Sequence, residues 1–302
     1  MSGSITLENR FGVNKMELIS LKYAIFVIVL LVLYYCFPKK YRWYVLLAGS
    51  MAYYVIICKW YVLFIIFTIC TTYGSTIWID KLLKEQNAIV KSHKEDWDRQ
   101  TRKEYKEKGR KKRVAVMLFA LLCNFGILAF LKYIPYAGEL GLLLPLGISF
   151  YTFQSMGYVM DVYREIVEPE KNFLKVALFV SFFPQIIQGP IAIYDKLAGQ
   201  LYEGHSLRLE NLQKGALLVL WGVMKKLVIA DRAVNIINFV MDKPMDFSGT
   251  YVFFAAVVYA LQLYADFSGG IDIVRGIAEM FGITMSTNFN HPYFSRSLTE
   301  YW

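Results

Sequence analysis

Apolar and polar residues follow one another along this chain in long blocks. Seven blocks are mostly apolar, at residues 17–37, 43–57, 60–79, 114–133, 142–162, 212–240 and 251–267, although the block at 212–240 is apolar only at its core. Uninterrupted apolar stretches of about 20 residues are typical of helices that cross a bilayer. The pattern therefore predicts an all-α, polytopic membrane protein, with a tight turn near Lys59 between the second and third blocks.

One further apolar block, at residues 173–187, contains Pro184 and ends at Gln188-Gly189-Pro190. A break in a helix frees backbone groups that lipid cannot satisfy, so such a segment must be buried in protein or line a cavity. We expect a broken or re-entrant helix here, inside a helical bundle.

The one extended hydrophilic segment covers residues 80–113 and is dense in lysine, arginine, glutamate and aspartate. It predicts a solvated helix pair with charge pairs four residues apart. A docking surface, for anionic lipid headgroups among other ligands, is the alternative. Basic loops mark the cytoplasmic side. With a second basic cluster at Lys39, Lys40 and Arg42, two blocks away, this places 80–113 in the cytoplasm and the N-terminus outside.

Composition supports the membrane class: 56% of the residues are hydrophobic and 17% are aromatic. The net charge of +9 lies largely beside the apolar blocks, which argues against nucleic acid as a partner and for the lipid bilayer. No CxxC pair or metal-ligand spacing occurs, so we expect no bound metal. The cysteines lie in or beside apolar blocks and are interpreted as small buried residues: Cys36, Cys58, Cys70 and Cys123.

Polar residues gather where the last apolar block ends, before a short helix-like segment expected at 273–281. Polar groups at membrane depth usually have a function. A buried network that fixes helix packing is the alternative for any one of them. Gly269 and Gly270 permit a close backbone approach. Lys225 and Lys226 could pair with Asp231, meet Asp266 or reach the interface. The candidate polar residues are Gln154, Gln188, Gln262, Asp266, Ser268, Asn288 and Asn290.

Several motifs resemble the membrane-bound O-acyltransferase family, in the bacterial branch that acts on alginate and peptidoglycan. The resemblance is carried by DFSGGIDI at 266–273 and NFNHPYFSRSLTEYW at 288–302. Three earlier passages resemble the same branch in the same order: PLGISFYTFQSMGYVMDVYR at 145–164, FFPQIIQGPI at 182–191 and GVMKKLVIADR at 222–232. The likeness is close over residues 145–302.

The resemblance implies an O-acyltransferase, most simply an O-acetyltransferase, in the bacterial plasma membrane. Its donor would be a cytoplasmic thioester, acyl-CoA or an acylated carrier protein, which segment 80–113 could dock. Its acceptor would be a hydroxyl of a surface polysaccharide or of a protein that relays the acyl group. The seven candidate residues would then line the substrate passage, with no bound cofactor.

Acyl transfer to a hydroxyl needs a general base, and histidine is the usual one near neutral pH. His93 falls in the charged segment, His205 in what we expect to be an exposed loop, and His291 near the polar cluster. We interpret His291 as a residue that makes a local hydrogen bond in its loop. A catalytic role is the alternative. The resemblance implies that the family's catalytic histidines follow Trp302. Residues 1–302 would then be the N-terminal portion of a single membrane domain, inactive alone.

Two other functions fit the same pattern. A transporter could use Lys225 and Asp266 on a translocation path, and a non-catalytic membrane scaffold could dock a partner enzyme. Substrate flux without acyl transfer would distinguish the transporter.

Overall fold

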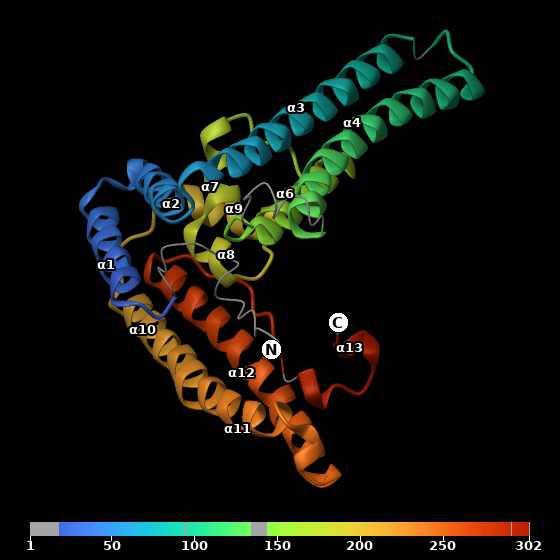
Figure 1. Ribbon diagram of the computed structural model, residues 1–302. Coiled ribbons are helices and arrows are strands. Elements are labelled where there is room, and N and C mark those ends of the chain that lie inside the picture. The colour runs from blue at the N-terminus through green and yellow to red at the C-terminus, as the bar shows by residue number, and fades with distance from the viewer. Residues whose placement is uncertain (1–17, 94, 134–143, 291, 302) are drawn as a thin grey trace. The chain divides into compact units, whose positions relative to one another are not determined.

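The computed structural model describes residues 18–93, 95–133, 144–290 and 292–301 (Figure 1). Every regular element within these ranges is a helix. Among the described residues, three helical runs are long and apolar enough to cross a membrane: Lys39–Ser92, Arg99–Tyr133 and Gly249–Met280. Leu21–Cys36 and Phe173–Gln188 are shorter apolar helices. The predicted all-α polytopic class is confirmed.

Contacts divide the chain into two compact units. Unit 1 contains Trp43–Ile186 and Ile191–Glu203, and unit 2 contains Met16–Arg42, Ile187–Pro190 and Gly204–Trp302. The single membrane domain proposed for residues 1–302 stays a prediction.

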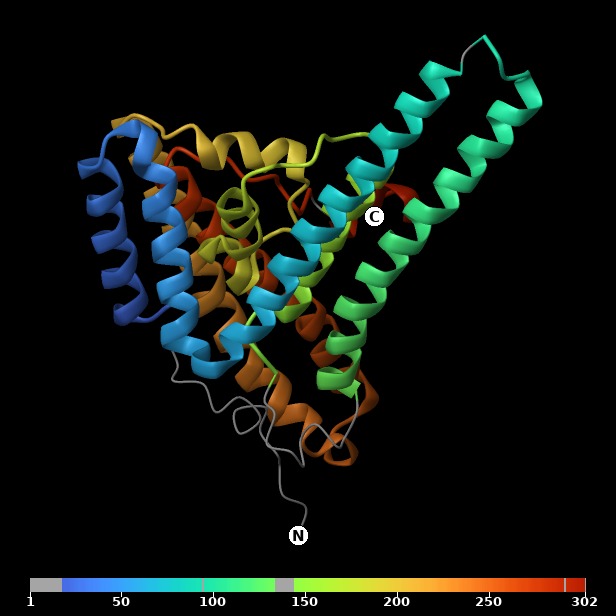
Figure 2. The same cartoon turned by 90° about the horizontal axis from the view of Figure 1, so that it is seen from above.

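Unit 1 is built around a long helical hairpin. In both views α3 and α4 run side by side from their apolar halves to the turn that joins their charged ends (Figure 2). The other helices of unit 1 precede or follow this hairpin along the chain. The elements are α2 (Arg42–Cys58), α3 (Val62–Ser92), α4 (Arg99–Tyr133), α6 (Ile148–Tyr163), α7 (Phe173–Ser181), α8 (Phe183–Gln188) and α9 (Tyr194–Tyr202). The predicted turn near Lys59 is confirmed as a short 3-10 helix, Lys59–Tyr61.

The charged segment forms the outer halves of α3 and α4, so the predicted helix pair is confirmed. Lys84 pairs with Asp80, four residues earlier on α3. Asp98 caps α4, because its Oδ1 accepts a hydrogen bond from the backbone N–H of Thr101 at 3.0 Å. Hydrogen bonds from Thr101 lower the pKa of Asp98, and the bond from the Thr101 side chain contributes more than the bond from its backbone N–H.

The predicted break in the block at 173–187 is confirmed. Helix α7 ends before Phe182, and α8 is a short helix that ends at Gln188. Freed backbone groups find partners, since the backbone N–H of Phe183 donates to Ser50 Oγ at 3.1 Å. The Gln154 amide Nε2 donates to the Phe179 carbonyl oxygen at 2.8 Å. The segment is therefore buried in protein, as expected, while its depth in a membrane stays a prediction.

Gly147 begins α6 in a backbone conformation that other residues avoid. Its φ is +68°, and a Cβ there would lie 2.2 Å from the carbonyl oxygen of Ile186. We expect Gly147→Ala to lower the free energy of unfolding by about 2 kcal/mol, through the clash and the unfavourable φ. Thermal unfolding in detergent measures this. Gly157→Ala on the same helix, where a Cβ meets nothing within 4 Å, is the control. Equal melting temperatures for both variants would contradict the prediction.

Unit 2 is organised by α10 and α12, which lie against each other (Figure 1). The predicted block at 212–240 is one helical run with a π-helical turn in its middle. The last apolar block continues further than predicted, because α12 does not end near Gly269 and Gly270. The separate segment expected at 273–281 is largely the end of this helix. The elements are α1 (Leu21–Cys36), α10 (Leu209–Met224), a π turn (Lys225–Ala230), α11 (Asp231–Met241), α12 (Gly249–Met280) and α13 (Leu298–Tyr301).

Candidate functional site

Glycines bring the backbones of α10 and α12 into direct contact. A Cβ at Gly222 would lie 2.4 Å from the carbonyl oxygen of Gly269, and one at Gly276 would lie 2.6 Å from that of Gly215. From Gly215 to Gly222 along α10, the facing glycine on α12 moves back from Gly276 to Gly269. The two helices are therefore antiparallel. Small residues at helix interfaces allow this close approach in membranes. The side chains that follow Gly222 are thereby carried close to α12.

Two ion pairs connect the π turn to α12. Lys225 Nζ lies 2.5 Å from Asp272 Oδ2 and 3.5 Å from Ser268 Oγ. Lys226 Nζ pairs with Asp266 Oδ1. Adjacent residues of a regular α-helix point about 100° apart, whereas these two lysines both reach one neighbouring helix. The wider π turn accompanies this arrangement, and π turns occur frequently at functional sites.

The pair at Asp272 is the more buried of the two. The side chains of Lys225 and Asp272 are 14% and 12% exposed, against 27% and 35% for Lys226 and Asp266. Arg275 Nη1 also lies 3.4 Å from Asp272 Oδ1, so one carboxylate faces two cations. Arg275 Nε is buried and has no hydrogen-bond partner among the described residues. The network thus holds one buried donor that a ligand could use.

Gln188, at the end of the broken segment, lies against the same part of α12. A Cβ at Gly270 would come within 2.1 Å of Gln188 Oε1, so the amide of Gln188 lies directly against this glycine. Among the predicted site residues, unit 2 therefore brings Gln188 against the stretch of α12 that carries Asp266 and Ser268. Gln262 lies one turn before Asp266 and is half-buried.

The other predicted residues lie elsewhere. Gln154 belongs to unit 1, where it is buried and bonded to the Phe179 carbonyl. Asn288 and Asn290 are exposed on the segment after α12, and their side chains make no hydrogen bond in the described parts of the chain. That segment is held to α12 by its aromatic residues: Phe289 packs on Tyr264 and Phe267, and the Tyr293 hydroxyl donates to the Ala260 carbonyl at 2.8 Å.

The histidines of the described chain lie in other contacts. The His93 ring stacks on Trp97 at the end of α3. His205, expected in an exposed loop, is half-buried; its backbone N–H donates to the Tyr34 hydroxyl at 3.0 Å, and its carbonyl accepts from Arg42. The expectation of exposure was wrong because α1 covers this loop. His291 lies outside the described residues. Within them, no three metal-ligating side chains of His, Cys, Asp or Glu cluster.

Sequence reasoning noted Asp272 among the polar groups at the end of the last apolar block but did not include it among the site residues, and it missed Arg275. It left the partner of the two lysines open, and one of its alternatives, contact with Asp266, is confirmed for Lys226. The signal for Asp272 was available in DFSGGIDI, which carries two aspartates. Their separation of six residues does not match the three- or four-residue spacing of one helix face, so sequence alone could not show that both face the π turn.

Comparison with protein families found no family model that matches this chain. Individual proteins do match. The chain is 32% identical over 224 residues to a peptidoglycan O-acetyltransferase of Helicobacter pylori, which covers 62% of this chain and 42% of that protein. It is 37% identical over 162 residues to a probable alginate O-acetylase of Pseudomonas syringae, covering 53% and 30%. It is 25% identical over 163 residues to a teichoic acid D-alanyltransferase of Bacillus subtilis, covering 52% and 40%.

These relatives are all membrane-bound O-acyltransferases, so the resemblance that the motifs indicated is confirmed over more than half of this chain. The chain spans less than half of the length of each of the three.

Proposed function

We propose that this chain is part of a membrane O-acyltransferase of the bacterial plasma membrane. The enzyme would move an acetyl or other acyl group from a cytoplasmic thioester, on coenzyme A or a carrier protein, to a hydroxyl of a surface polysaccharide or of a relay protein. The observation that carries the proposal is the 224-residue similarity to a peptidoglycan O-acetyltransferase. In this proposal the N-terminus lies outside and residues 80–113 lie in the cytoplasm.

The polar network of unit 2 supplies groups that such a reaction needs beside its general base. Acyl transfer requires donors near the developing oxyanion and a fixed position for the thioester and the alcohol. Lys225 and Arg275 are cationic donors held by Asp272, and Ser268 and Gln188 add a hydroxyl and an amide. We assign these residues positioning roles along the proposed acyl passage.

The passage is proposed to follow α12 past Gln262, Asp266 and Ser268. The side chain of Gln188, at the end of α8, lies against this helix at Gly270. The sequence also proposed Gln154, Asn288 and Asn290, from other segments, and their part in the passage stays a prediction. The burial of charge on a helix that is apolar enough to span a membrane supports this role, because such charge is costly and rarely incidental.

Transfer of radiolabelled acetyl from acetyl-CoA to polymer in membranes that contain the full-length protein tests the proposal. We expect Asp266→Asn to lower transfer about 10-fold or more, because Lys226 loses its partner and the passage shifts. Asp242→Asn, at an exposed aspartate, is the matched control and should leave transfer unchanged. Absence of transfer by the unmodified protein would refute the enzyme, and equal transfer by both variants would refute the site.

A transporter is the second candidate, favoured by the same buried charges. Lys225 and Asp266 would then bind a translocated ion or solute. Solute flux into proteoliposomes, with no acyl transfer by the same preparation, would favour it over the enzyme.

A further inference from the structure

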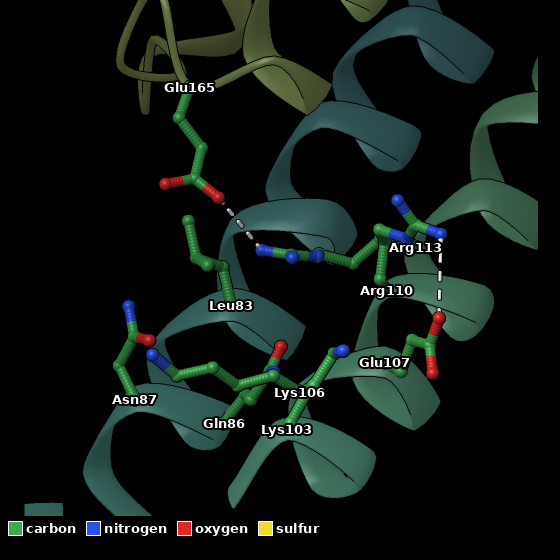
Figure 3. Close-up of a pocket in the computed structure, with 9 residues that line it drawn as sticks. All are labelled: Leu83, Gln86, Asn87, Lys103, Lys106, Glu107, Arg110, Arg113 and Glu165. Carbon is green, nitrogen blue, oxygen red and sulfur yellow. Dashed lines mark hydrogen bonds and ion pairs between the residues drawn. The ribbon is translucent and has the colours of Figure 1, made fainter. Parts of the chain in front are cut away.

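A basic groove lies between the charged halves of α3 and α4, in unit 1. It encloses about 420 Å³ (Figure 3). Four of its lining residues are cationic and two are acidic: Lys103, Lys106, Arg110 and Arg113 against Glu107 and Glu165. The groove therefore carries net positive charge and fits an anionic ligand.

In the part of the chain that the structure describes, two of the four cations that line the groove are in ion pairs, and the other two are not. Glu107 Oε1 lies 4.0 Å from Arg110 Nη2, and Glu165 Oε1 lies 3.1 Å from Arg113 Nη1 (Figure 3). Lys103 and Lys106 have no ion-pair partner among the described residues. Glu165 is held in place with a φ of +61°, a conformation that non-glycine residues seldom adopt. The two acidic residues thus orient the arginines, and the lysines remain for a ligand.

A buried donor and a buried acceptor at the groove also lack partners. Arg113 is 8% exposed, and its Nε makes no hydrogen bond within the described chain. Gln86 is 6% exposed, and its Oε1 is likewise unpaired there. Most buried polar atoms in native proteins are satisfied. An oxyanion at Arg113 would supply the missing acceptor for Nε.

The groove begins where α4 becomes apolar. Arg113 directly precedes the apolar residues 114–133 of α4. With a helical rise of about 1.5 Å per residue, Arg110 lies about 5 Å and Lys106 about 10 Å further along the axis. The headgroup layer is about 5–7 Å thick on each side of the hydrocarbon core. With residues 114–133 of α4 in the hydrocarbon core, Arg110 and Arg113 would lie at the level of the lipid phosphates.

We propose that this groove binds the phosphate of an anionic phospholipid. Arg113 and Arg110 contact the phosphate, and Lys106 and Lys103 contact the outer part of the headgroup. Basic pockets beside membrane helices bind anionic headgroups in this way. Phosphates also occur on soluble thioester donors, but a groove that begins at the first apolar residue of a spanning helix favours the lipid. The inference needs only the membrane location, not the acyltransferase activity.

Native mass spectrometry of the full chain in detergent, with phosphatidylglycerol or phosphatidylcholine added, tests the proposal. We expect the protein to retain phosphatidylglycerol in preference to phosphatidylcholine. Lys103→Gln/Lys106→Gln changes two exposed side chains, so the fold is kept, and should weaken phosphatidylglycerol binding by about 10- to 30-fold.

The matched control is Lys91→Gln/Arg99→Gln, which removes the same charge from exposed positions at the far end of the hairpin and should leave binding unchanged. Three outcomes would overturn the proposal. They are equal retention of both lipids, an equal loss in the control, or displacement of phosphatidylglycerol by equimolar coenzyme A, which would assign the groove to a soluble phosphate.

Discussion

Replacing Asp272 by asparagine is expected to lower the free energy of unfolding by about 3–5 kcal/mol, the usual cost of removing one partner from a buried ion pair. The carboxylate lies 2.5 Å from Lys225 Nζ and 3.4 Å from Arg275 Nη1. Asparagine has the same shape but no charge, so two largely buried cations would face each other without compensation. Denaturation in mixed detergent micelles, followed by circular dichroism, measures the effect.

Removing the other partner of the ion pair shows whether the cost comes from uncompensated charge or from the loss of one contact. Lys225→Met leaves Asp272 paired with Arg275, so we expect a smaller loss, about 1–3 kcal/mol. Asp246→Asn, at an exposed aspartate, is the matched control and should change stability by less than about 0.5 kcal/mol. If Asp272→Asn cost no more than Lys225→Met, the buried carboxylate would not be the centre of the network.

Replacing Gly222 by valine is expected to separate α10 from α12 and to cost about 3 kcal/mol. A Cβ at this position would lie 2.4 Å from the Gly269 carbonyl oxygen and 2.9 Å from the Ile273 backbone nitrogen. Backbone atoms of a helix cannot move aside as a flexible side chain does. Lys225 is one turn further on, so its contact with Asp272 would loosen too. A lower melting temperature and lower acyl transfer in the same preparation measure the two effects.

Gly126→Val on α4 is the control for Gly222→Val. A Cβ at Gly126 meets nothing within 4 Å, so valine there adds bulk without a backbone clash. We expect a change of less than about 1 kcal/mol in either direction. The close contact of α10 and α12 would be refuted by a Gly222→Val variant as stable as this control.

Much of the fold follows from local patterns. The broken segment was predictable because Pro184 and the sequence Gln188-Gly189-Pro190 restrict the backbone whatever surrounds them. The hairpin of α3 and α4 was predictable because its charged halves cannot enter lipid and its apolar halves can. The continuity of α12 through Gly269 and Gly270 was not. Glycine weakens an isolated helix, but here a facing helix packs directly on it.

Within the candidate site, the residue types were predictable and their pairing was not. Asp266, Ser268 and Gln188 stood out as polar groups in or beside apolar blocks. That Lys226 meets Asp266 while Lys225 meets Asp272 depends on the antiparallel register of α10 and α12. Asn288 and Asn290 stood out in the sequence in the same way, as polar residues near an apolar block. In the structure they are exposed and join no such pair.

The sequence by itself determined the membrane class, the positions of most helices and the resemblance to O-acyltransferases, because hydrophobicity, turn-forming residues and motifs are read from neighbouring positions. Only the tertiary structure decided which charges meet. Glycines on two helices, more than 40 residues apart in the chain, set the distance between the backbones, and a π turn directs adjacent lysines to two carboxylates. Neither relation is a property of any short stretch of residues.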